Sequence, residues 1–422
     1  MVDLEKALAH PDKILFLDIE TTGLSRVYDY VTLVGCELDG KYYHYKQGDD
    51  ISLITKLFKE SYAIVTFNGT LFDIKFLKHH FPELVFPEHH IDLRYLMRRV
   101  GYTGGQKRIE VELGLTRQEA LKGMTGYEAV VLWHEYRRGS LDAFKKLVEY
   151  NHADIQGMKY MLEVALRHEK TVERYKERYA FSHFNFPIQK LPHIAVDAQS
   201  EKPKPRVYAK DLWKKVQKPH GKVIGIDLTG SELRPSGFAV LHEDNTVDTK
   251  QCLTDKEMIA LCKEIQPSII SIDSPLGIPK GRLTCFDDDP TRYEIGIMRF
   301  AERELKRRGV NVYPCLIPSM QRLTFRGMSL AKKLRKLGFI VIESYPGAAQ
   351  DIMQIPRKHA GLPYLKDGLH EFGIKKGHWY HEKVSHDELD AITSAIVGLF
   401  YLAGKYEALG NEFEEYLVIP KI

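Results

Sequence analysis

The feature that most constrains this chain is an apolar segment that ends in acidic residues and a threonine-containing turn, and it occurs twice. Near the N-terminus, the apolar run Ile14–Asp18 leads through Ile19 to Glu20 and a Thr-Thr-Gly turn. Far downstream, the apolar run Val223–Asp227 leads to a Leu-Thr-Gly-Ser turn. Short aliphatic runs bounded by turn residues predict buried strands. Both halves therefore begin with a strand, an acid and a turn, which suggests one architecture used twice.

Hydrophobic periodicity extends this pattern through both halves. In the N-terminal half it predicts a mainly helical stretch to about residue 170, preceded by a helix at 50–60 and strands at Val31–Leu38, Lys41–Gln47 and Ala63–Phe67. In the C-terminal half it predicts strands at Gly237–His242, Ser268–Asp273 and Phe339–Ser344, and helices at 255–265, 292–308, 329–337 and 386–402. Strands that alternate with helices indicate an α/β fold class.

Length and charge distribution fit two folded units joined by a basic connector. A chain of 422 residues is long enough for two or three domains, and 44% hydrophobic residues suffice for packed cores. Residues 166–220 contain thirteen Lys and Arg against six Asp and Glu, and the Lys-Pro-Lys-Pro run at 202–205 cannot be helical. This stretch is either a solvated connector or a contact for a polyanion. We expect one domain over residues 1–175, a basic linker over 176–220 and a second domain over 221–422.

Composition also excludes several classes of protein. The five cysteines are scattered without a CxxC pair, which fits neither a disulfide framework nor a zinc site. No apolar run is long enough to cross a bilayer, and the N-terminus lacks the apolar core of a secretory signal. We therefore expect a cytoplasmic protein without a membrane partner.

Acidic residues in the N-terminal half predict a metal site. Asp18 and Glu20 are two residues apart and so lie on one face of one strand, where two carboxylates repel each other and lose hydration. A divalent cation compensates for this most simply. Asp73 follows the strand that ends near Asn68, although an Asp there could instead serve the N-terminus of a helix. Tyr150 and Asp154 are four residues apart on a predicted helix and face the same way.

Three segments, in this order, resemble the three motifs of the DEDD superfamily of 3′–5′ exonucleases: Asp18-Ile-Glu20, Phe67-Asn68-Gly69 leading to Asp73, and Tyr150-x-x-x-Asp154. The tyrosine matches the Tyr subtype, close to the YprB-type ribonuclease-H-like exonucleases. The histidine subtype would need His at the position of Glu149. The resemblance covers roughly the first 165 residues and implies an RNase H-like domain with a mixed sheet flanked by helices.

This resemblance implies a hydrolase that cleaves phosphodiester bonds with two divalent cations, Mg²⁺ or Mn²⁺, in its active site. Asp18, Glu20 and Asp154 would hold one ion, and Asp18, with Asp73 through water, would hold the second. Tyr150 would orient the attacking water, since a phenol with a pKa of about 10 is protonated at neutral pH. The implied partner is the single-stranded end of DNA or RNA. Candidates for contact with its terminal nucleotide, each of which could equally be a core or turn residue, are Leu24, Phe67 and Asn68.

A second set of acids marks the C-terminal half. Asp227, Asp273 and Glu343 each end a predicted strand, and Asp387 and Asp390 lie on one face of the closing helix. Ligands of open α/β sheets bind beyond the carboxyl ends of strands, where these side chains would gather. Clustered like charges destabilise a fold unless a partner offsets them. The pattern therefore predicts a second ligand site.

About 200 residues around these acids are similar to an uncharacterised family predicted to be RNase H-like, RuvC-like nucleases. The similarity rests on Gly225-Ile-Asp227, Ile272-Asp273-Ser-Pro, Glu343-Ser-Tyr-Pro-Gly and His386-Asp387-x-x-Asp390-Ala. It implies a second catalytic site with two divalent cations, in which Asp227, Asp273 and Glu343 act with Asp387 or Asp390, and Asp387 is slightly favoured as the metal ligand.

Two alternatives remain open for the C-terminal half. The turn after Asp227 also opens actin-like ATPases and sugar kinases, so this half could be a phosphotransferase, although no Gly-rich nucleotide loop is present. It could also be a nuclease fold that binds nucleic acid without cleaving it. A purely structural role would leave the clustered carboxylates unexplained.

Overall fold

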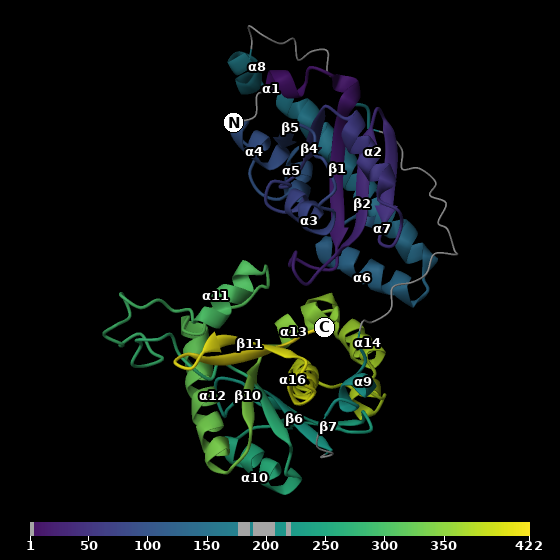
Figure 1. Ribbon diagram of the computed structural model, residues 1–422. Coiled ribbons are helices and arrows are strands. Elements are labelled where there is room, and N and C mark those ends of the chain that lie inside the picture. Colours follow the sequence, from purple (N-terminus) through teal and green to yellow (C-terminus); the bar gives the residue numbers. More distant parts are fainter. Residues whose placement is uncertain (1–3, 176–185, 189–206, 217–220) are drawn as a thin grey trace. The chain divides into compact units, whose positions relative to one another are not determined.

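The computed structural model describes residues 4–175, 186–188, 207–216 and 221–422. Contacts divide the chain near residue 203 into an N-terminal and a C-terminal unit, each built on one mixed sheet with flanking helices (Figure 1). The α/β fold class expected from the sequence is confirmed.

The N-terminal sheet has the strand order β3-β2-β1-β4-β5. Strand β1 pairs antiparallel with β2 and parallel with β4, so it lies at the centre of the sheet. Strand β3 continues the antiparallel side and β5 the parallel side. The strands are β1 (Ile14–Thr21), β2 (Val31–Leu38), β3 (Lys41–Lys46), β4 (Ala63–Thr66) and β5 (His89–Asp92).

Helices cover both faces of this sheet because successive side chains of β1 point to opposite sides. Ile14 and Phe16 pack with α4, α5 and α7, whereas Leu15 and Leu17 pack with α2 and α3. The helices are α1 (Leu4–Ala7), α2 (Ser52–Glu60), α3 (Asp73–His80), α4 (Leu93–Arg99), α5 (Gln106–Glu112), α6 (Gly126–Arg138), α7 (Leu141–Arg167) and α8 (Glu169–Tyr175), with 3₁₀ turns at Pro11–Lys13 and Glu119–Leu121.

The C-terminal sheet repeats this design and adds a hairpin. Its order is β11-β12-β10-β9-β6-β7-β8, in which β8-β7-β6-β9-β10 matches the first sheet in order and in strand direction. The architecture expected to occur twice is therefore present in both units. The strands are β6 (Lys222–Asp227), β7 (Ser236–His242), β8 (Val247–Cys252), β9 (Ile269–Asp273), β10 (Val341–Ser344), β11 (Tyr406–Asn411) and β12 (Glu415–Pro420).

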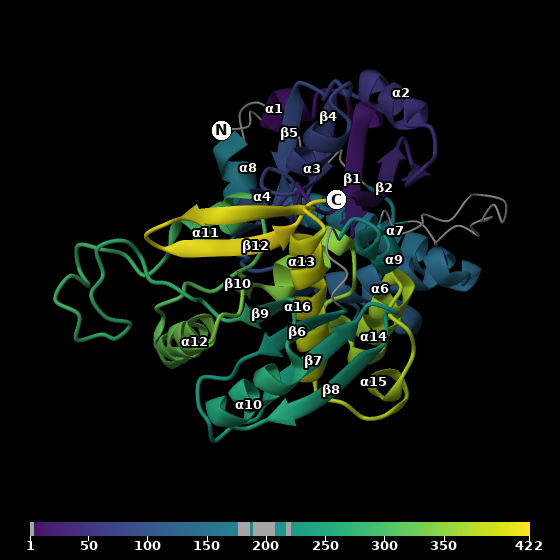
Figure 2. The same ribbon diagram turned by 60° about the horizontal axis from the view of Figure 1, so that its bottom comes forward.

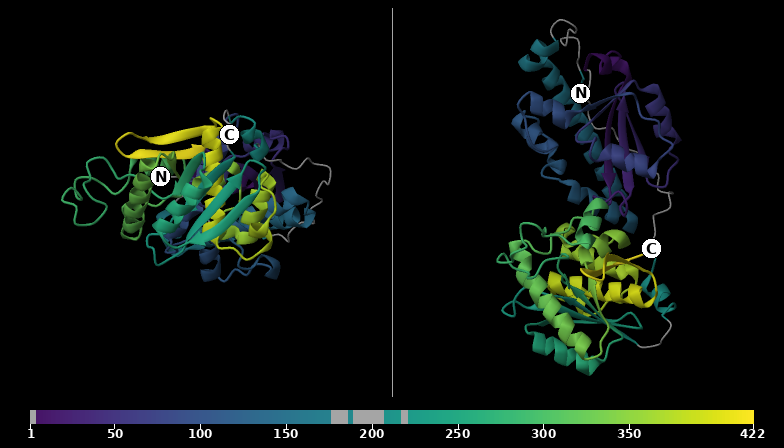
Figure 3. Two further views of the ribbon diagram at one scale, coloured as in Figure 1. Left: turned by 90° about the horizontal axis from the view of Figure 1, so that it is seen from below. Right: turned by 60° about the vertical axis from the view of Figure 1, so that its left-hand side comes forward.

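One long apolar helix, α16, lies along one face of this sheet (Figure 2) and packs with Val223 and Ala239. Ile224 and Ile226 pack on the other face with residues of α10 and α12. Figure 3 shows α16, in yellow, on one side of this sheet and the teal and green helices on the other. The helices are α9 (Ala209–Trp213), α10 (Asp255–Ile265), α11 (Phe300–Arg307), α12 (Pro318–Lys336), α13 (Pro346–Met353), α14 (Leu362–Phe372), α15 (His378–His381) and α16 (His386–Leu402), with a 3₁₀ turn at Lys358–Ala360.

The structure differs from the sequence expectations in short and polar elements. Strand β5 lies in the stretch expected to be helical, and neither β8 nor the β11–β12 hairpin was predicted. The helix expected at 329–337 begins at Pro318, since proline is tolerated in a first turn. The helix expected at 292–308 is confined to α11.

Part of the expected linker belongs to the C-terminal core. Helix α9 buries Ala209 and Leu212 against that core, so these residues are not a connector. The rest of the basic stretch, apart from 186–188 and 207–216, lies outside the described residues.

Gly225 of β6 allows α16 to approach the sheet closely. A Cβ atom at Gly225 would lie 2.0 Å from the Ala391 carbonyl oxygen and 2.4 Å from the Ala395 amide nitrogen. We expect Gly225→Ala to lower the free energy of unfolding by about 3 kcal/mol or more, because helix backbone must move. Denaturant unfolding measures this. Gly296→Ala, whose Cβ would meet nothing within 4 Å, is the control, and equal losses in both variants would contradict the packing argument.

Candidate functional site

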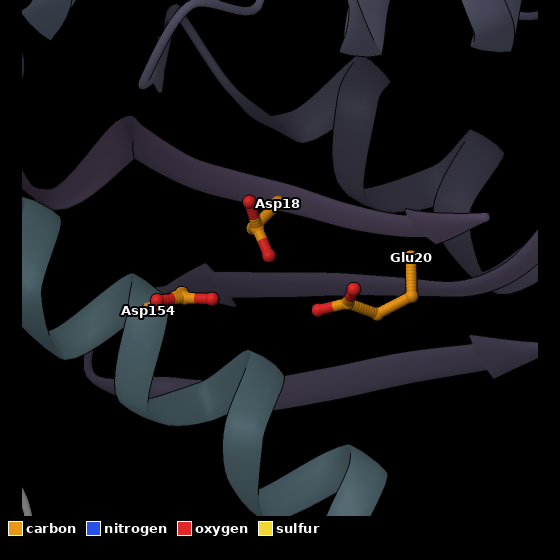
Figure 4. A group of neighbouring side chains, drawn as sticks. All are labelled: Asp18, Glu20 and Asp154. Atoms are coloured by element: carbon orange, nitrogen blue, oxygen red, sulfur yellow. The ribbon is translucent and has the colours of Figure 1, made fainter. Parts of the chain in front are cut away.

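Three carboxylates converge beside the centre of the N-terminal sheet (Figure 4). Asp18 and Glu20 project from the same face of β1, and Asp154 projects from α7. One oxygen from each side chain lies within 4.8 Å of the others. Within the described part of the chain, this is the one group of three or more acidic, His or Cys side chains arranged so closely.

Burial makes the ionised form of these carboxyls unfavourable. It raises the pKa of Asp18 and of Glu20 well above the ordinary range, and repulsion among the acids adds to both shifts. Burial also raises the pKa of Asp154, although the Arg117 guanidinium opposes this shift. An uncompensated cluster of this kind is costly, whereas a hard divalent cation favours an all-oxygen donor set.

Asp73 adjoins this cluster from the first turn of α3. Its Oδ1 accepts a hydrogen bond of 3.2 Å from the backbone amide of Ile19, which lies between the two acids of β1. Burial raises the pKa of Asp73 to about 7. Asp73 thus lies both at a helix N-terminus and against the site. Its position is compatible with a role as a metal-site acid and with a role at the N-terminus of α3.

Asn151, which no sequence motif indicated, holds the acids of β1 in place. Its side-chain amide donates to Asp18 Oδ2 at 2.8 Å and to the Asp18 carbonyl at 3.2 Å, and its own oxygen accepts from the Tyr42 hydroxyl at 2.8 Å. Gly35 of β2 leaves room for it, because a Cβ there would lie 1.7 Å from Asn151 Oδ1. An Asn next to Tyr150 gives no sequence signal of this role.

Two cations that the sequence analysis also missed lie against the acids. Arg117 donates to Asp154 and pairs with Glu110 at 2.6 Å. Lys107 donates to the Tyr150 hydroxyl and lies 4.0 Å from the centre of that ring. Tyr150 is buried, and the hydrogen bond from Lys107 orients its hydroxyl. Both cations follow β5 in sequence, far from the acidic motifs, so only folding brings them here.

The three candidates for contact with a nucleotide have different environments. Asn68 adopts φ of +65°, and its amide donates to Asp92 Oδ1 at 2.8 Å, which fixes the turn after β4. Phe67 is half-buried and packs against the core, while Leu24 is 68% exposed. Asp92, which caps α4 and also accepts from the Thr70 amide, is a positioning residue that the sequence analysis did not identify.

The C-terminal acids meet at the equivalent edge of the second sheet. Asp227 and Asp273 are register partners on the parallel strands β6 and β9. Burial raises the pKa of both well above the ordinary range, with repulsion between them and from Asp390 adding to it. All three line a cavity of about 310 Å³.

The other two acids of this set are placed differently. Glu343 lines the cavity, but its oxygens accept hydrogen bonds from Arg299 and from the amide of Leu276 at 2.7 Å. Arg299 is itself buried between Glu343 and Glu302. Asp387 does not line the cavity, and its Oδ1 lies 2.8 Å from the ring of His386. Asp390 thus shares the cavity lining with Asp227 and Asp273, whereas Asp387 lies outside the lining but is close enough to add to the raised pKa of both strand-end acids.

A family model described as the RNase H superfamily matches residues 15–166, and the N-terminal unit has an RNase H-like fold. No curated protein matches the chain at a significant level. No described helix is both long enough and apolar enough to span a membrane.

Three solved structures are similar to the chain at low identity. A nuclease in its apo form is 17% identical over 42% of this chain and 79% of its own, with a TM-score of 0.29. The family B DNA polymerase of the archaeon Pyrobaculum calidifontis is 13% identical over 97% and 53%, with a TM-score of 0.29. The catalytic core of RRP6 from Trypanosoma brucei is 10% identical over 78% of both chains, with a TM-score of 0.28.

The raised pKa of Asp73 predicts how stability depends on pH. Because the folded chain keeps this proton to about pH 7 while the unfolded chain loses it near its ordinary value of 3.8, the metal-free fold loses stability as pH rises between these values. The shift corresponds to a free energy on the order of 4 kcal/mol. Thermal unfolding in EDTA at pH 5 and pH 8 measures the loss, and added Mn²⁺ should restore stability at pH 8.

Asp73→Asn provides the comparison for this measurement. Without the titrating carboxyl, the unfolding temperature of the variant should depend less on pH than that of the wild type. Identical pH profiles for the two proteins would contradict the assignment.

Proposed function

We propose that the N-terminal unit is a metal-dependent nuclease that removes nucleotides from single-stranded 3′ ends of DNA or RNA. The observation that carries this proposal is the convergence of Asp18, Glu20 and Asp154 with Asp73 alongside. The DEDD-type motifs that predicted these residues, with the RNase H-like fold that holds them, support the exonuclease class.

The residues present suit a divalent cation. Buried carboxylates with raised pKa values lack sufficient positive charge around them, and their oxygens are the ligands that Mg²⁺ and Mn²⁺ prefer. Asp18, Glu20 and Asp154 would hold one ion, and Asp18 with Asp73 a second. Such ions would stabilise the attacking and leaving oxygens of an in-line phosphoryl displacement.

The remaining side chains position and balance this site. Asn151 fixes the Asp18 carboxylate through its amide. Tyr150, whose hydroxyl accepts a hydrogen bond from Lys107, would hold the attacking water by a hydrogen bond. Arg117 offsets negative charge at Asp154.

The five cysteines are buried free thiols, which is consistent with the cytoplasmic setting that we also propose.

We expect Asp18→Asn or Asp154→Asn to lower the rate of Mn²⁺-dependent digestion of a 3′-labelled single-stranded oligonucleotide at least about a hundredfold, since each removes a charged metal ligand. Circular dichroism would check that folding is retained. Asp142→Asn is the matched control, because Asp142 lies on the same helix with a side chain that is 94% exposed. Undiminished digestion by both site variants would refute the assignment.

For the C-terminal unit we propose a second hydrolytic site on nucleic acid, based on Asp227, Asp273 and Asp390. Their meeting at the carboxyl ends of β6 and β9 supports this role, because that edge is where the first unit places its acids. The buried Arg299 guanidinium donates hydrogen bonds to the Glu343 carboxylate. We therefore assign Glu343 a positioning role rather than that of a metal ligand.

A double variant tests the second site. Nuclease activity that survives Asp18→Asn on single-stranded, duplex, hybrid or structured substrates should disappear when Asp227→Asn is added. If Asp227→Asn changes digestion of none of these substrates, the unit is a non-catalytic binding module. Hydrolysis of ATP that depends on Asp227 would instead identify a phosphotransferase-like unit.

A further inference from the structure

The cavity of the C-terminal unit has the size of a site for one small ligand. Its volume of about 310 Å³ is near the lower end of the range of roughly 300–1,000 Å³ typical of small-molecule sites. Its lining comes from the ends of β6, β9 and β10 and from α12, α13 and α16. Such walls admit a single nucleotide unit more readily than a stretch of paired strands.

One side of the cavity is suited to an anion. Ser344 at the end of β10 is 2% exposed and lines the cavity, yet its Oγ has no hydrogen-bond partner among the described residues. Helix α13 begins two residues later, and no side chain caps its N-terminus. The first amides of a helix lack intrahelical partners and attract anions. Pro346, the first residue of this turn, has no amide hydrogen to donate, so the backbone donor that lines the cavity here is that of Gly347. Lys358 lines the cavity as well.

The adjoining side of the cavity is suited to a cation. Ser344 is the register partner of Asp273, which in turn is the partner of Asp227. Asp390 completes the acidic side, and its Oδ2 is 3.7 Å from the Lys358 ammonium. A divalent ion bound by few carboxylates commonly completes its coordination with phosphate oxygens. A phosphate could therefore contact both sides at once.

The remaining lining is apolar and aromatic. Tyr313, Tyr345, Met320 and Leu323 contribute to it, and Tyr345 is held by a hydrogen bond of 2.7 Å from its hydroxyl to the Asn311 carbonyl. Aromatic and apolar side chains bind the face of any base, whatever its identity. The lining thus offers separate places for a cation, a phosphate and a base.

From these contacts we propose that the cavity binds one phosphate-bearing nucleotide unit, with its phosphate at Ser344 and the first turn of α13 and a divalent cation between that phosphate and Asp227, Asp273 and Asp390. This inference rests on the proposed nucleic-acid role of the C-terminal unit and names the form in which that unit takes its ligand. The unit would be either a free nucleoside monophosphate or the phosphorylated end of a strand.

Calorimetric titration of the full chain carrying Asp18→Asn, with dAMP in saturating Mn²⁺, tests the proposal. We expect dAMP to bind in the presence of Mn²⁺ but not in EDTA, and Asp273→Asn to abolish that dependence. Ser344→Ala should weaken binding about tenfold, the effect of losing one hydrogen bond to a charged group. Lys358→Gln, at an exposed side chain whose change leaves the core intact, should weaken it several-fold.

Matched variants separate binding from packing. Ser271→Ala removes another buried Oγ without a partner, outside the cavity lining, and Lys332→Gln removes an exposed Lys elsewhere. Both should bind dAMP as the parent does. Absence of dAMP binding, or equal losses in Ser344→Ala and Ser271→Ala, would overturn the proposal.

Further ligands define what the cavity accepts. Inorganic phosphate and deoxyadenosine should each bind more weakly than dAMP, and phosphate binding as tightly as dAMP would overturn the role of the apolar lining. A 5′-phosphorylated oligonucleotide that competes with dAMP, when its unphosphorylated form does not, would identify a strand end as the source. Competition by neither would identify the free nucleotide.

This experiment is independent of hydrolysis, because dAMP contains no phosphodiester bond. A catalytically inactive unit that binds dAMP would retain the inference and lose the proposed hydrolytic function. An active unit that fails to bind dAMP would retain the proposed hydrolytic function and lose the inference.

Discussion

Both units of this protein depend on the same electrostatic constraint, which is the burial of several carboxylates toward the carboxyl ends of central strands. Burial and mutual repulsion raise the pKa values of Asp18 and Glu20 in the first unit and of Asp227 and Asp273 in the second. The free-energy cost is offset only when positive charge enters the site. Nearby Lys and Arg side chains supply part of it, and in the first unit the close approach of the carboxylate oxygens suits a divalent ion for the rest.

The two units meet this constraint with the same architecture. In each, the central strand contributes the first acid, and a long helix packed across that strand contributes another, Asp154 on α7 or Asp390 on α16. Glycines at the contact let the helix approach closely enough, Gly35 in the first unit and Gly225 in the second. The close packing of helix on sheet is therefore what brings residues distant in sequence within reach of one ligand.

The units differ in what surrounds their acids. The first has an Asn amide and two cationic side chains from outside the motifs, at the site for which we propose action on the end of a strand. The second has a cavity with an uncapped helix N-terminus and the buried Ser344 hydroxyl beside Asp273. The corresponding strand ends thus carry a buried acidic cluster with cationic neighbours in one unit and a cavity of small-ligand size in the other, and we relate the proposed roles to that difference.

Local sequence determined the strands that carry the acids, because apolar runs bounded by turns specify buried strands without reference to the rest of the chain. It also determined that Asp18 and Glu20 share a face, since side chains alternate along a strand. The edge strand β8 was missed because its mainly polar side chains carry no strong periodicity. The β11–β12 hairpin was also missed, although β12 contains the buried apolar run Leu417–Ile419. Asn151, Lys107, Arg117 and Ser344 were missed for a different reason. Their roles depend on which neighbours the fold supplies. Only tertiary packing of α5 and the loop after it, of α7 and of β10 placed them against acids that lie far away in the chain.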